Sequence, residues 1–277
     1  MSHPNPYAAP AAPPPLPMKE VIGGPGQSAM EYMRAYHYIF ENPNWMTTVL
    51  YIGLLSLAGI IPGVGIILQL FFLGYQFEVL EALLRTRGTK YPDFDFGRIG
   101  EYLGRGVWPF LVNLVVAFVL LPLIYMALIV LGVIVAVFAS LAGDDAAPVI
   151  ATIGGSFAVV IFSGFVIAMM MLVAPMILRA GLAQDFAAAF QFRWISDFVR
   201  KMYVEMILAG LFMMATAVGL GLLGLLACFV GILAVTPIIL LAQTHLLYQL
   251  YSIYLTRGGT PVPVKVAAPL PMGPPPK

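Results

Sequence analysis

The sequence predicts an all-α integral membrane protein with six transmembrane helices, cytoplasmic N and C termini, and amphipathic helices at the membrane interface. Of its 277 residues, 61% are hydrophobic and only 10% are charged, against about 45–50% and 25% in soluble domains. Long apolar runs lie at residues 46–84, 107–142, 148–178 and 202–256. Each run exceeds the roughly 20 residues that a helix needs to cross a bilayer, and the few basic residues flank alternate ends of the runs.

Proline-rich segments occupy both ends of the chain. Residues 1–27 and 259–277 hold 15 of the 23 prolines and lack apolar periodicity, so we expect two disordered tails. No apolar stretch follows a basic start near the N-terminus, which argues against a cleaved secretory signal. Residues 28–258 are therefore expected to form the transmembrane domain.

The apolar runs divide into six expected crossings. The first and last runs are long enough to cross twice, and each contains a Pro/Gly break, at residues 62–65 and 228–237. The middle runs contain Pro122 and Pro175 without polar turn residues nearby, so each is expected to be a single kinked helix. The expected crossings are 46–61, 66–86, 107–141, 148–180, 202–227 and 232–256.

The distribution of charge predicts the orientation. The segments between the second and third crossings and between the fourth and fifth are rich in Lys and Arg, and Arg257 and Lys265 follow the last crossing. The segment 141–148 holds Asp144 and Asp145 and no basic residue. Because positively charged loops stay in the cytoplasm, the sequence predicts cytoplasmic termini and an outward-facing acidic loop.

A repeated unit of one interfacial helix and one hairpin is suggested by two alignments. Residues 94–105 align with 190–201 without a gap, and aromatic, aliphatic, acidic and basic positions coincide. A third interfacial helix is expected at 28–42, where Ser28 and Glu31 have capping-box spacing. The even-numbered crossings end in similar Arg/Gly sequences at 84–88, 178–181 and 255–258, as in a parallel repeat about the membrane normal. Glycine C-caps and the positive-inside rule can also produce such endings.

Few ionisable side chains lie within the apolar runs, and those few are candidates for function. The candidate intramembrane polar site is His245 with Gln243, Thr244 and Gln249, together with Glu78 from the second crossing. His245 could serve as a proton relay or substrate contact, but a neutral imidazole hydrogen-bonded to Gln or Thr is favoured. The spacing i, i+4 predicts simple ion pairs for Glu81 with Arg85 and for Lys201 with Glu205.

Small residues in the fifth crossing indicate helix packing. Residues 219–224 spell GxGxxG, but they lie inside an apolar run without the strand and helix N-terminus that a dinucleotide site needs. The recurrence of small residues at helical spacing instead predicts a close helix contact. The residues of this face are Ala217, Gly221, Gly224 and Cys228.

Catalytic motifs and metal-ligand spacings are missing from the sequence. One cysteine and three histidines cannot supply a typical structural zinc site or an intramolecular disulfide. A formal charge of +1 is too small and too sparse to hold a phosphate backbone. We therefore expect no cofactor, no metal, no enzymatic activity and no nucleic-acid partner.

Several of these segments together resemble a known family. The features are Trp45, the break at 62–65, the exit Gly74-Tyr75-Gln76-Phe77-Glu78, the loop 92–97 with Gly106, the segment 184–192 and the closing 257–259. This set is similar to the family called domain of unknown function 4013, polytopic membrane proteins of bacteria and archaea, over roughly residues 45–259. The resemblance implies an integral membrane protein and carries over no catalytic residue.

Function follows only coarsely from these features. We expect a non-enzymatic scaffold or interaction component of the cytoplasmic (inner) membrane, in contact with the lipid bilayer and with a protein partner or a second copy of the chain. The alternative is a small-solute transporter or channel built from the parallel repeats. Convergence of Glu78, His245, Gln69 and Asn113 on one water-accessible cavity would favour transport, and dispersal among separate helix contacts would favour the interaction role.

Overall fold

The computed structural model describes residues 27–61, 63–141, 143, 145–227 and 230–264, and these residues form helices and no strand. Most of both predicted tails, together with Pro62, Asp144 and Cys228, lies outside the described residues. Two single 3₁₀ turns, η1 (Phe96–Arg98) and η2 (Ala187–Phe190), precede α5 and α7. The α-helices are α2 (Arg34–Glu41), α3 (Trp45–Ala58), α4 (Val64–Thr86), α5 (Ile99–Leu141), α6 (Ala147–Ala183), α7 (Phe192–Leu226) and α8 (Val230–Thr256).

Five of these helices, α4 to α8, are long and apolar enough to cross a membrane. The first expected crossing, 46–61, corresponds to α3, which has only 14 residues. At 1.5 Å per residue α3 spans about 21 Å, less than the roughly 30 Å of a hydrocarbon core. Several helices are therefore long and apolar enough to cross a membrane, but α3 is too short for a full crossing, because the chain turns at Gly59.

The middle runs form single helices, as predicted. Helix α5 continues through Pro109 and Pro122 over 43 residues, and α6 continues through Pro175 over 37 residues. The expected interfacial helices at 94–105 and 190–201 are not separate elements: after each 3₁₀ turn the chain enters α5 or α7 directly. Helix α5 continues through Gly104, Gly106 and Pro109, so one helix contains both the interfacial and the apolar residues.

The N-terminal interfacial helix is shorter than predicted. Residues 28–31 are not helical, and α2 begins at Arg34 without a side-chain cap, so the predicted capping box of Ser28 and Glu31 does not form. The buried side of α2 is formed by Ala35, Tyr38 and Ile39, whereas Met33 and Phe40 are exposed. An exposed apolar side on a short helix before Trp45 is consistent with a position at the membrane interface.

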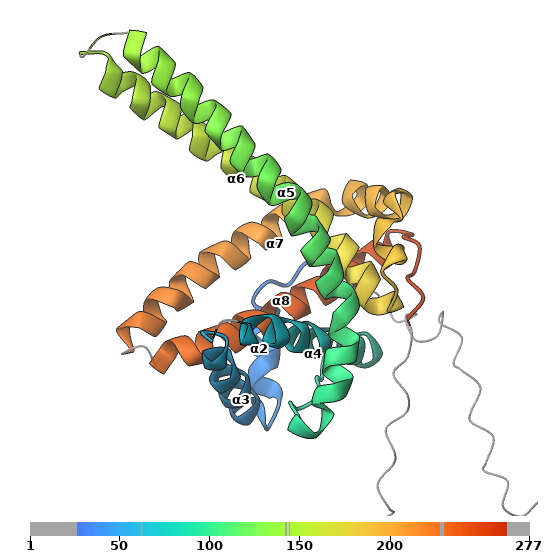
Figure 1. Cartoon of the computed structure of the whole chain (residues 1–277). Coiled ribbons are helices and arrows are strands. Elements are labelled where there is room, and N and C mark those ends of the chain that lie inside the picture. Colours follow the sequence, from blue (N-terminus) through green and yellow to red (C-terminus); the bar gives the residue numbers. More distant parts are fainter. Residues whose placement is uncertain (1–26, 62, 142, 144, 228–229, 265–277) are drawn as a thin grey trace, which may run out of the picture.

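Helices α3 to α8 form three successive pairs that we call hairpins, α3–α4, α5–α6 and α7–α8, and the contacts between neighbouring pairs close a ring. Within the ring α4 contacts α5, α6 contacts α7, and α8 returns to contact α3 and α2. Helix α4 also contacts α8 across the middle. Figure 1 shows the α5–α6 hairpin extending far from the rest of the molecule. Helices α3 and α4 contact each other at few residues, whereas α5 with α6 and α7 with α8 pack along much of their length, so the first pair does not repeat the packing of the other two.

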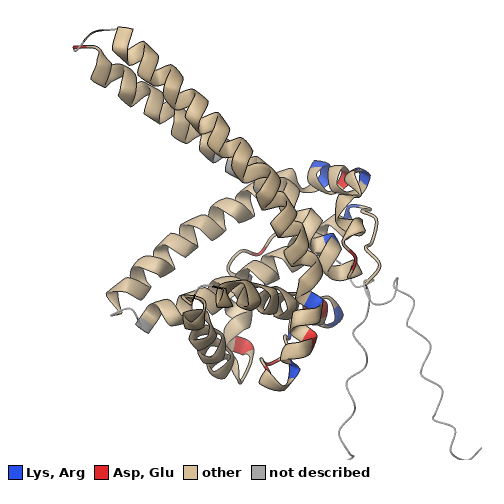
Figure 2. Ribbon diagram, viewed as in Figure 1, with Lys and Arg blue, Asp and Glu red and all other residues tan. Residues whose placement is uncertain are grey.

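Charged residues gather at one end of the three hairpins. Figure 2 shows Lys and Arg near the connections between hairpins, whereas the described parts of the hairpin tips carry none. Asp145 lies at the tip of the α5–α6 hairpin. We call the end with the basic residues the charged end. This separation matches the predicted pattern of charge.

Helices α4, α6 and α8 end in the same kind of C-cap at the charged end. In each, a residue with positive φ follows the last turn, and the next N–H donates to a carbonyl oxygen five residues back. Helix α6 therefore ends at Ala183, three residues beyond the predicted end at 180. The left-handed residues are Arg87, Gln184 and Gly258, and the N–H to O pairs are Gly88 to Leu83, Asp185 to Ala180 and Gly259 to Tyr254.

The described part of the C-terminal segment, residues 259–264, packs on the helices, although we expected a disordered tail. The indole N–H of Trp194 donates to the Thr260 carbonyl at 2.8 Å, and the Val262 N–H donates to the Tyr251 hydroxyl at 2.8 Å. The Val262 side chain is fully buried. An extended Pro-containing segment is thus fixed because its backbone groups find side-chain partners.

Candidate functional site

The most connected polar group of the molecule is the Gln249 side chain on α8. Its amide nitrogen donates to the Glu31 carbonyl at 2.9 Å, and its oxygen accepts from the Glu31 N–H at 2.7 Å and from the Gln27 amide at 3.0 Å. The same amide nitrogen lies 2.9 Å from His245 Nδ1. Because an amide offers two donors and two acceptor positions, Gln249 is fully satisfied, and it pairs with Glu31 as a second backbone strand would. It therefore holds residues 27–31 on α8.

We call the contact of Gln249 with residues 27–31 the Gln249 clasp. His245 supports this clasp from one turn away on α8. The amide nitrogen can only donate, so His245 Nδ1 accepts, which assigns the proton of the neutral ring to Nε2. The Tyr38 ring lies on the imidazole, with ring centres 4.4 Å apart. His245 is buried, and among the described residues its Nε2 has no hydrogen-bond partner.

The other members of the predicted polar site lie elsewhere. The Thr244 hydroxyl donates to the Leu240 carbonyl of its own helix at 2.8 Å, and Gln243 is exposed on another side of α8. The structure thus brings together His245 and Gln249, but not Gln243 or Thr244. The N-terminal partner Glu31, 218 residues away in sequence, was not predicted, because a contact to backbone atoms leaves no signature in residue types.

Two buried tyrosines near the Gln249 clasp, one on α2 and one in the loop after α4, form further hydrogen bonds to backbone carbonyl groups. The Tyr38 hydroxyl donates to the Leu241 carbonyl at 2.8 Å, and the Tyr91 hydroxyl donates to the Ile39 carbonyl at 2.9 Å. Burial raises the pKa of both phenols above the usual tyrosine range. Both therefore remain neutral donors at physiological pH and join α2 to α8 and to the loop.

Glu78 lies in a different place, at the contact between α4 and α5. It forms an ion pair with Arg98, which also binds Glu101. One turn further, Glu81 is bound by Arg85, as predicted, and also by Arg105 of α5. Arg105 and Glu81 are both buried. Two acids one turn apart on α4 are thus neutralised by Arg98 of η1 and Arg105 of α5, so these charges hold helices together rather than form an open ionisable site.

The predicted ion pair of Lys201 with Glu205 does not form. Lys201 binds Asp197 at 3.0 Å, and Glu205 binds Arg257 from the end of α8. Asp197 also accepts a hydrogen bond from the Tyr254 hydroxyl at 2.8 Å. Both acids lie between α7 and α8, so a partner from the neighbouring helix replaces the i, i+4 partner for Glu205.

Glycines allow the closest helix contacts of the ring. A Cβ atom on Gly106 would lie 1.8 Å from the Leu70 carbonyl oxygen, and one on Gly74 would lie 1.8 Å from the Tyr102 carbonyl oxygen. These two glycines bring the backbones of α4 and α5 together beside the Glu81–Arg105 pair. Gly53 of α3 plays the same role against the Leu233 carbonyl of α8, where a Cβ would lie 2.3 Å away.

One of these backbone contacts, and one side-chain hydrogen bond between the end of α6 and α5, involve carbonyl groups that a proline sets free. Pro237 has no N–H for the Leu233 carbonyl, and that carbonyl faces Gly53. Pro109 likewise frees the Arg105 carbonyl, which accepts a hydrogen bond from the Gln184 amide at 3.4 Å. Free carbonyls are costly in hydrocarbon, so these contacts help to fix α3 on α8 and α6 on α5.

The predicted small-residue face of α7 is used only in part. Gly224 is buried and lies against the start of α8, where a Cβ would be 3.1 Å from the Ile232 nitrogen. A Cβ on Gly221 would meet nothing within 4 Å, and Ala217 is half-buried. Cys228 lies outside the described residues. The closest helix contacts are instead those of Gly53, Gly74 and Gly106.

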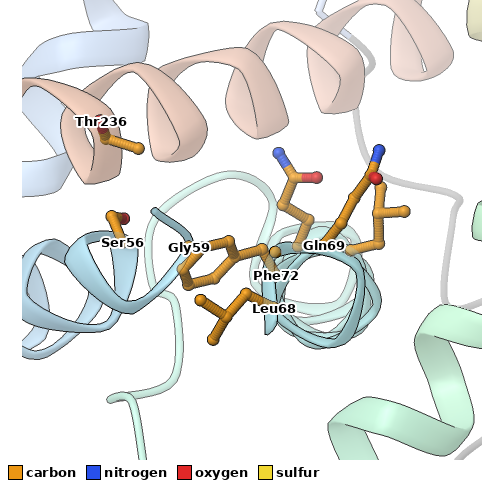
Figure 3. A pocket seen from close by; sticks show the side chains of 9 residues that line it. Ser56, Gly59, Leu68, Gln69, Phe72 and Thr236 are labelled. Carbon is orange, nitrogen blue, oxygen red and sulfur yellow. The ribbon is translucent and has the colours of Figure 1, made fainter. Parts of the chain in front are cut away.

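A pocket of about 400 Å³ lies between α3, α4 and α8 (Figure 3). Its polar lining consists of Ser56, Gln69, Gln76 and Thr236, and its apolar lining includes Leu68, Phe72 and Leu73. Figure 3 shows the Gln69 side chain extending from α4 toward α8, where Thr236 lies. Gln69, Thr236 and Gly59 are exposed, so the pocket is an open groove on the molecular surface. No acidic or basic side chain belongs to its described lining.

The four side chains that would mark a transport pathway do not share this pocket. Gln69 lines it, but Glu78 binds Arg98 and His245 binds Gln249, and Asn113 lies half-buried on α5 outside the lining. Within the described part of the chain, no group of three or more His, Cys, Asp or Glu side chains could hold a metal ion.

Comparison with known proteins identifies one family model, described as a protein of unknown function (DUF4013), which matches residues 57–232. The match covers α4 to α7 and the turns that flank them. It confirms the resemblance drawn from the sequence. No curated protein and no solved structure matches the chain.

Proposed function

Because the chain belongs to the DUF4013 family of proteins of unknown function, its role has to come from its geometry, and we propose a non-enzymatic component of a prokaryotic cytoplasmic membrane. In this role the charged end holds the three hairpins together. The α5–α6 hairpin then offers its apolar outer half to a membrane protein partner or to a second copy of the chain.

The observation that carries this proposal is the dispersal of the intramembrane polar groups. Glu78 pairs with Arg98 of η1, Glu81 pairs with Arg105 of α5, and His245 orients the Gln249 clasp. A pathway for a polar solute would gather such groups around one water-filled cavity. Here they hold helix contacts together, which is what a structural component needs.

The outer half of the α5–α6 hairpin supports the same role. Both helices project beyond the remaining hairpins (Figure 1), and their large side chains are exposed there, among them Phe118, Phe138 and Phe157. Helices α5 and α6 pack on each other, and Figure 1 shows no other helix beside the projecting end of the hairpin. An apolar two-helix hairpin free on both sides has the surface that lateral packing in a bilayer uses.

Site-specific photo-crosslinking in native membranes tests the proposal. A photoreactive residue replaces Phe157 on α6, and the matched control carries it at Leu222 on α7, which is also exposed but belongs to another hairpin. We expect one discrete protein adduct from position 157 and none from position 222. Lipid adducts alone from position 157 would overturn the proposal.

The pocket between α3, α4 and α8 is the one observation that favours the alternative, a small-solute transporter. Four hydrogen-bonding side chains from three helices line it, as in a solute site. Efflux of small uncharged solutes from vesicles that contain the purified protein separates the two roles. A transporter accelerates efflux and the Gln69→Leu variant abolishes the acceleration, whereas the proposed structural role gives the rate of protein-free vesicles.

A further inference from the structure

We infer that the pocket between α3, α4 and α8 binds the polar part of an uncharged glycerolipid of the diacylglycerol type. This inference is independent of the proposed partner contact on the α5–α6 hairpin. It rests on the depth of the pocket, on the chemistry of its lining and on the apolar surface at its mouth.

The depth follows from helix lengths. Ser56 and Gly59 lie 11 and 14 residues after Trp45, or about 16 and 21 Å along α3. Trp45 packs edge-on against Phe40, with ring centres 4.9 Å apart, in the position of an interfacial aromatic. With Trp45 at the interface, the pocket lies well within a hydrocarbon core of roughly 30 Å.

Hydrogen-bonding groups at this depth need partners. The Ser56 hydroxyl donates to the Ile52 carbonyl at 2.8 Å, and the Gln76 amide reaches the Leu240 carbonyl only at 3.5 Å. Gln69 and Thr236 have no hydrogen bond to any other described residue. Amide and hydroxyl groups left without partners in hydrocarbon are costly, which favours an occupant with its own donors and acceptors.

The lining selects the chemistry of that occupant. Carboxamides and hydroxyls can donate to ester carbonyl oxygens and exchange hydrogen bonds with a hydroxyl group. A phosphate would be buried without a counter-charge, because the described lining has no basic side chain. A lipid with a hydroxyl and two esters but no phosphate therefore fits, since only an uncharged polar group reaches this depth at low cost.

Apolar surface for the acyl chains surrounds the mouth of the pocket. Ile60 is 79% exposed, and Ile66 and Ile67 are each more than half exposed beside the pocket residues Gly65 and Leu68. A volume of about 400 Å³ holds the polar part of a glycerolipid, while its chains extend over these isoleucines. Polar lining and apolar surface thus lie side by side, as the polar part and the acyl chains of one glycerolipid molecule require.

Photolabelling of the full-length protein tests the inference. The protein is placed in phosphatidylcholine nanodiscs that contain a small fraction of photoactivatable diacylglycerol, and the labelled peptides are mapped. We expect labelling within residues 54–73 or 232–240 and competition by unlabelled diacylglycerol. A photoactivatable phosphatidic acid with the same chains serves as the charged comparison, and equal labelling of the same peptides by both lipids would overturn the inference.

Variants separate the pocket from general lipid contact. Loss of one carboxamide in Gln69→Leu lowers specific labelling about fivefold, as expected for one hydrogen bond. The matched control is Gln243→Leu, which removes an equally exposed glutamine of α8 outside the pocket and leaves labelling unchanged.

Blocking the pocket gives an independent readout. Leu73→Trp fills it from the apolar side and reduces labelling without removing a hydrogen bond. Unfolding midpoints in detergent are compared for all variants, so that a folding defect is recognised directly. Unchanged labelling in both Gln69→Leu and Leu73→Trp would overturn the inference, and it would leave the crosslinking result at Phe157 unaffected.

Discussion

The substitution Gly106→Ala tests the packing of α4 on α5. A Cβ at this position would lie 1.8 Å from the Leu70 carbonyl oxygen and 2.7 Å from its carbon. Because real Cβ atoms do not approach other atoms within 3.0 Å, the two backbones must separate by at least about 1.2 Å. Neither neighbour can yield by rotating a side chain, since both are backbone atoms.

The cost of this separation follows from what the contact contains. Overpacking a well-packed contact costs about 1–3 kcal/mol, and the same movement lengthens the buried ion pair between Glu81 and Arg105, the residue next to Gly106. We therefore expect a loss of about 3 kcal/mol. At roughly 2–4 °C per kcal/mol for a chain of this size, the unfolding midpoint falls by about 6–12 °C.

Thermal unfolding of the purified protein in one detergent measures this effect. The matched control is Gly104→Ala on the same helix, because a Cβ at position 104 would meet nothing within 4 Å. Both variants gain the same helix propensity, about 1 kcal/mol in favour of alanine. The midpoint is expected to stay or rise slightly for Gly104→Ala and to fall for Gly106→Ala. Equal midpoints for the two variants would refute the packing described above.

Three further substitutions test the other contacts of the charged end. Glu81→Gln leaves the buried Arg105 without a counter-charge and lowers the free energy of unfolding by about 3 kcal/mol. The control Glu101→Gln costs under about 1 kcal/mol, because the Glu101 side chain is 59% exposed. Denaturant titrations measure both, and similar losses for the two variants would contradict this prediction. Gln249→Leu releases residues 27–31 from α8. A cysteine introduced at Ser28, in a Cys228→Ser background, is then expected to react faster with maleimide. Gln243→Leu on the same helix leaves this reaction rate unchanged. Val262→Asp places a charge at a fully buried position and lowers the unfolding midpoint by several degrees. Pro263→Asp, at the exposed neighbouring residue, has little effect on the midpoint. An equal effect of both substitutions would show that the segment 259–264 is not packed on the helices.

Hydropathy predicted most of the helices because the requirement for about 20 apolar residues per crossing is strict. The exception is α3, where the sixteen-residue run 46–61 was expected to cross the membrane but the helix ends at Ala58. The starts of α5 and α7 were placed too late, since polar residues at an interface do not end a helix. Local composition identifies what enters the membrane better than where a helix begins.

The contacts between hairpins were less predictable. The pair Glu81–Arg85 followed from i, i+4 spacing, but Arg105 and Arg98 reach α4 only because Gly74 and Gly106 let the helices approach. The Gln249 clasp joins residues 218 positions apart through backbone atoms, which any residue type provides. A pattern of residue types along one chain does not report such contacts, because they depend on how the ring of hairpins closes.

We expect all three hairpins to enter the membrane from the charged end. Labelling of intact cells with a membrane-impermeant maleimide tests it most directly, with single cysteines at Ala146, Ala227 and Thr89 in a Cys228→Ser background. The account predicts labelling at 146 and 227, the tips of two hairpins, and labelling at 89 only after the membrane is permeabilised. Labelling at 89 in intact cells, or protection of either tip, would contradict it.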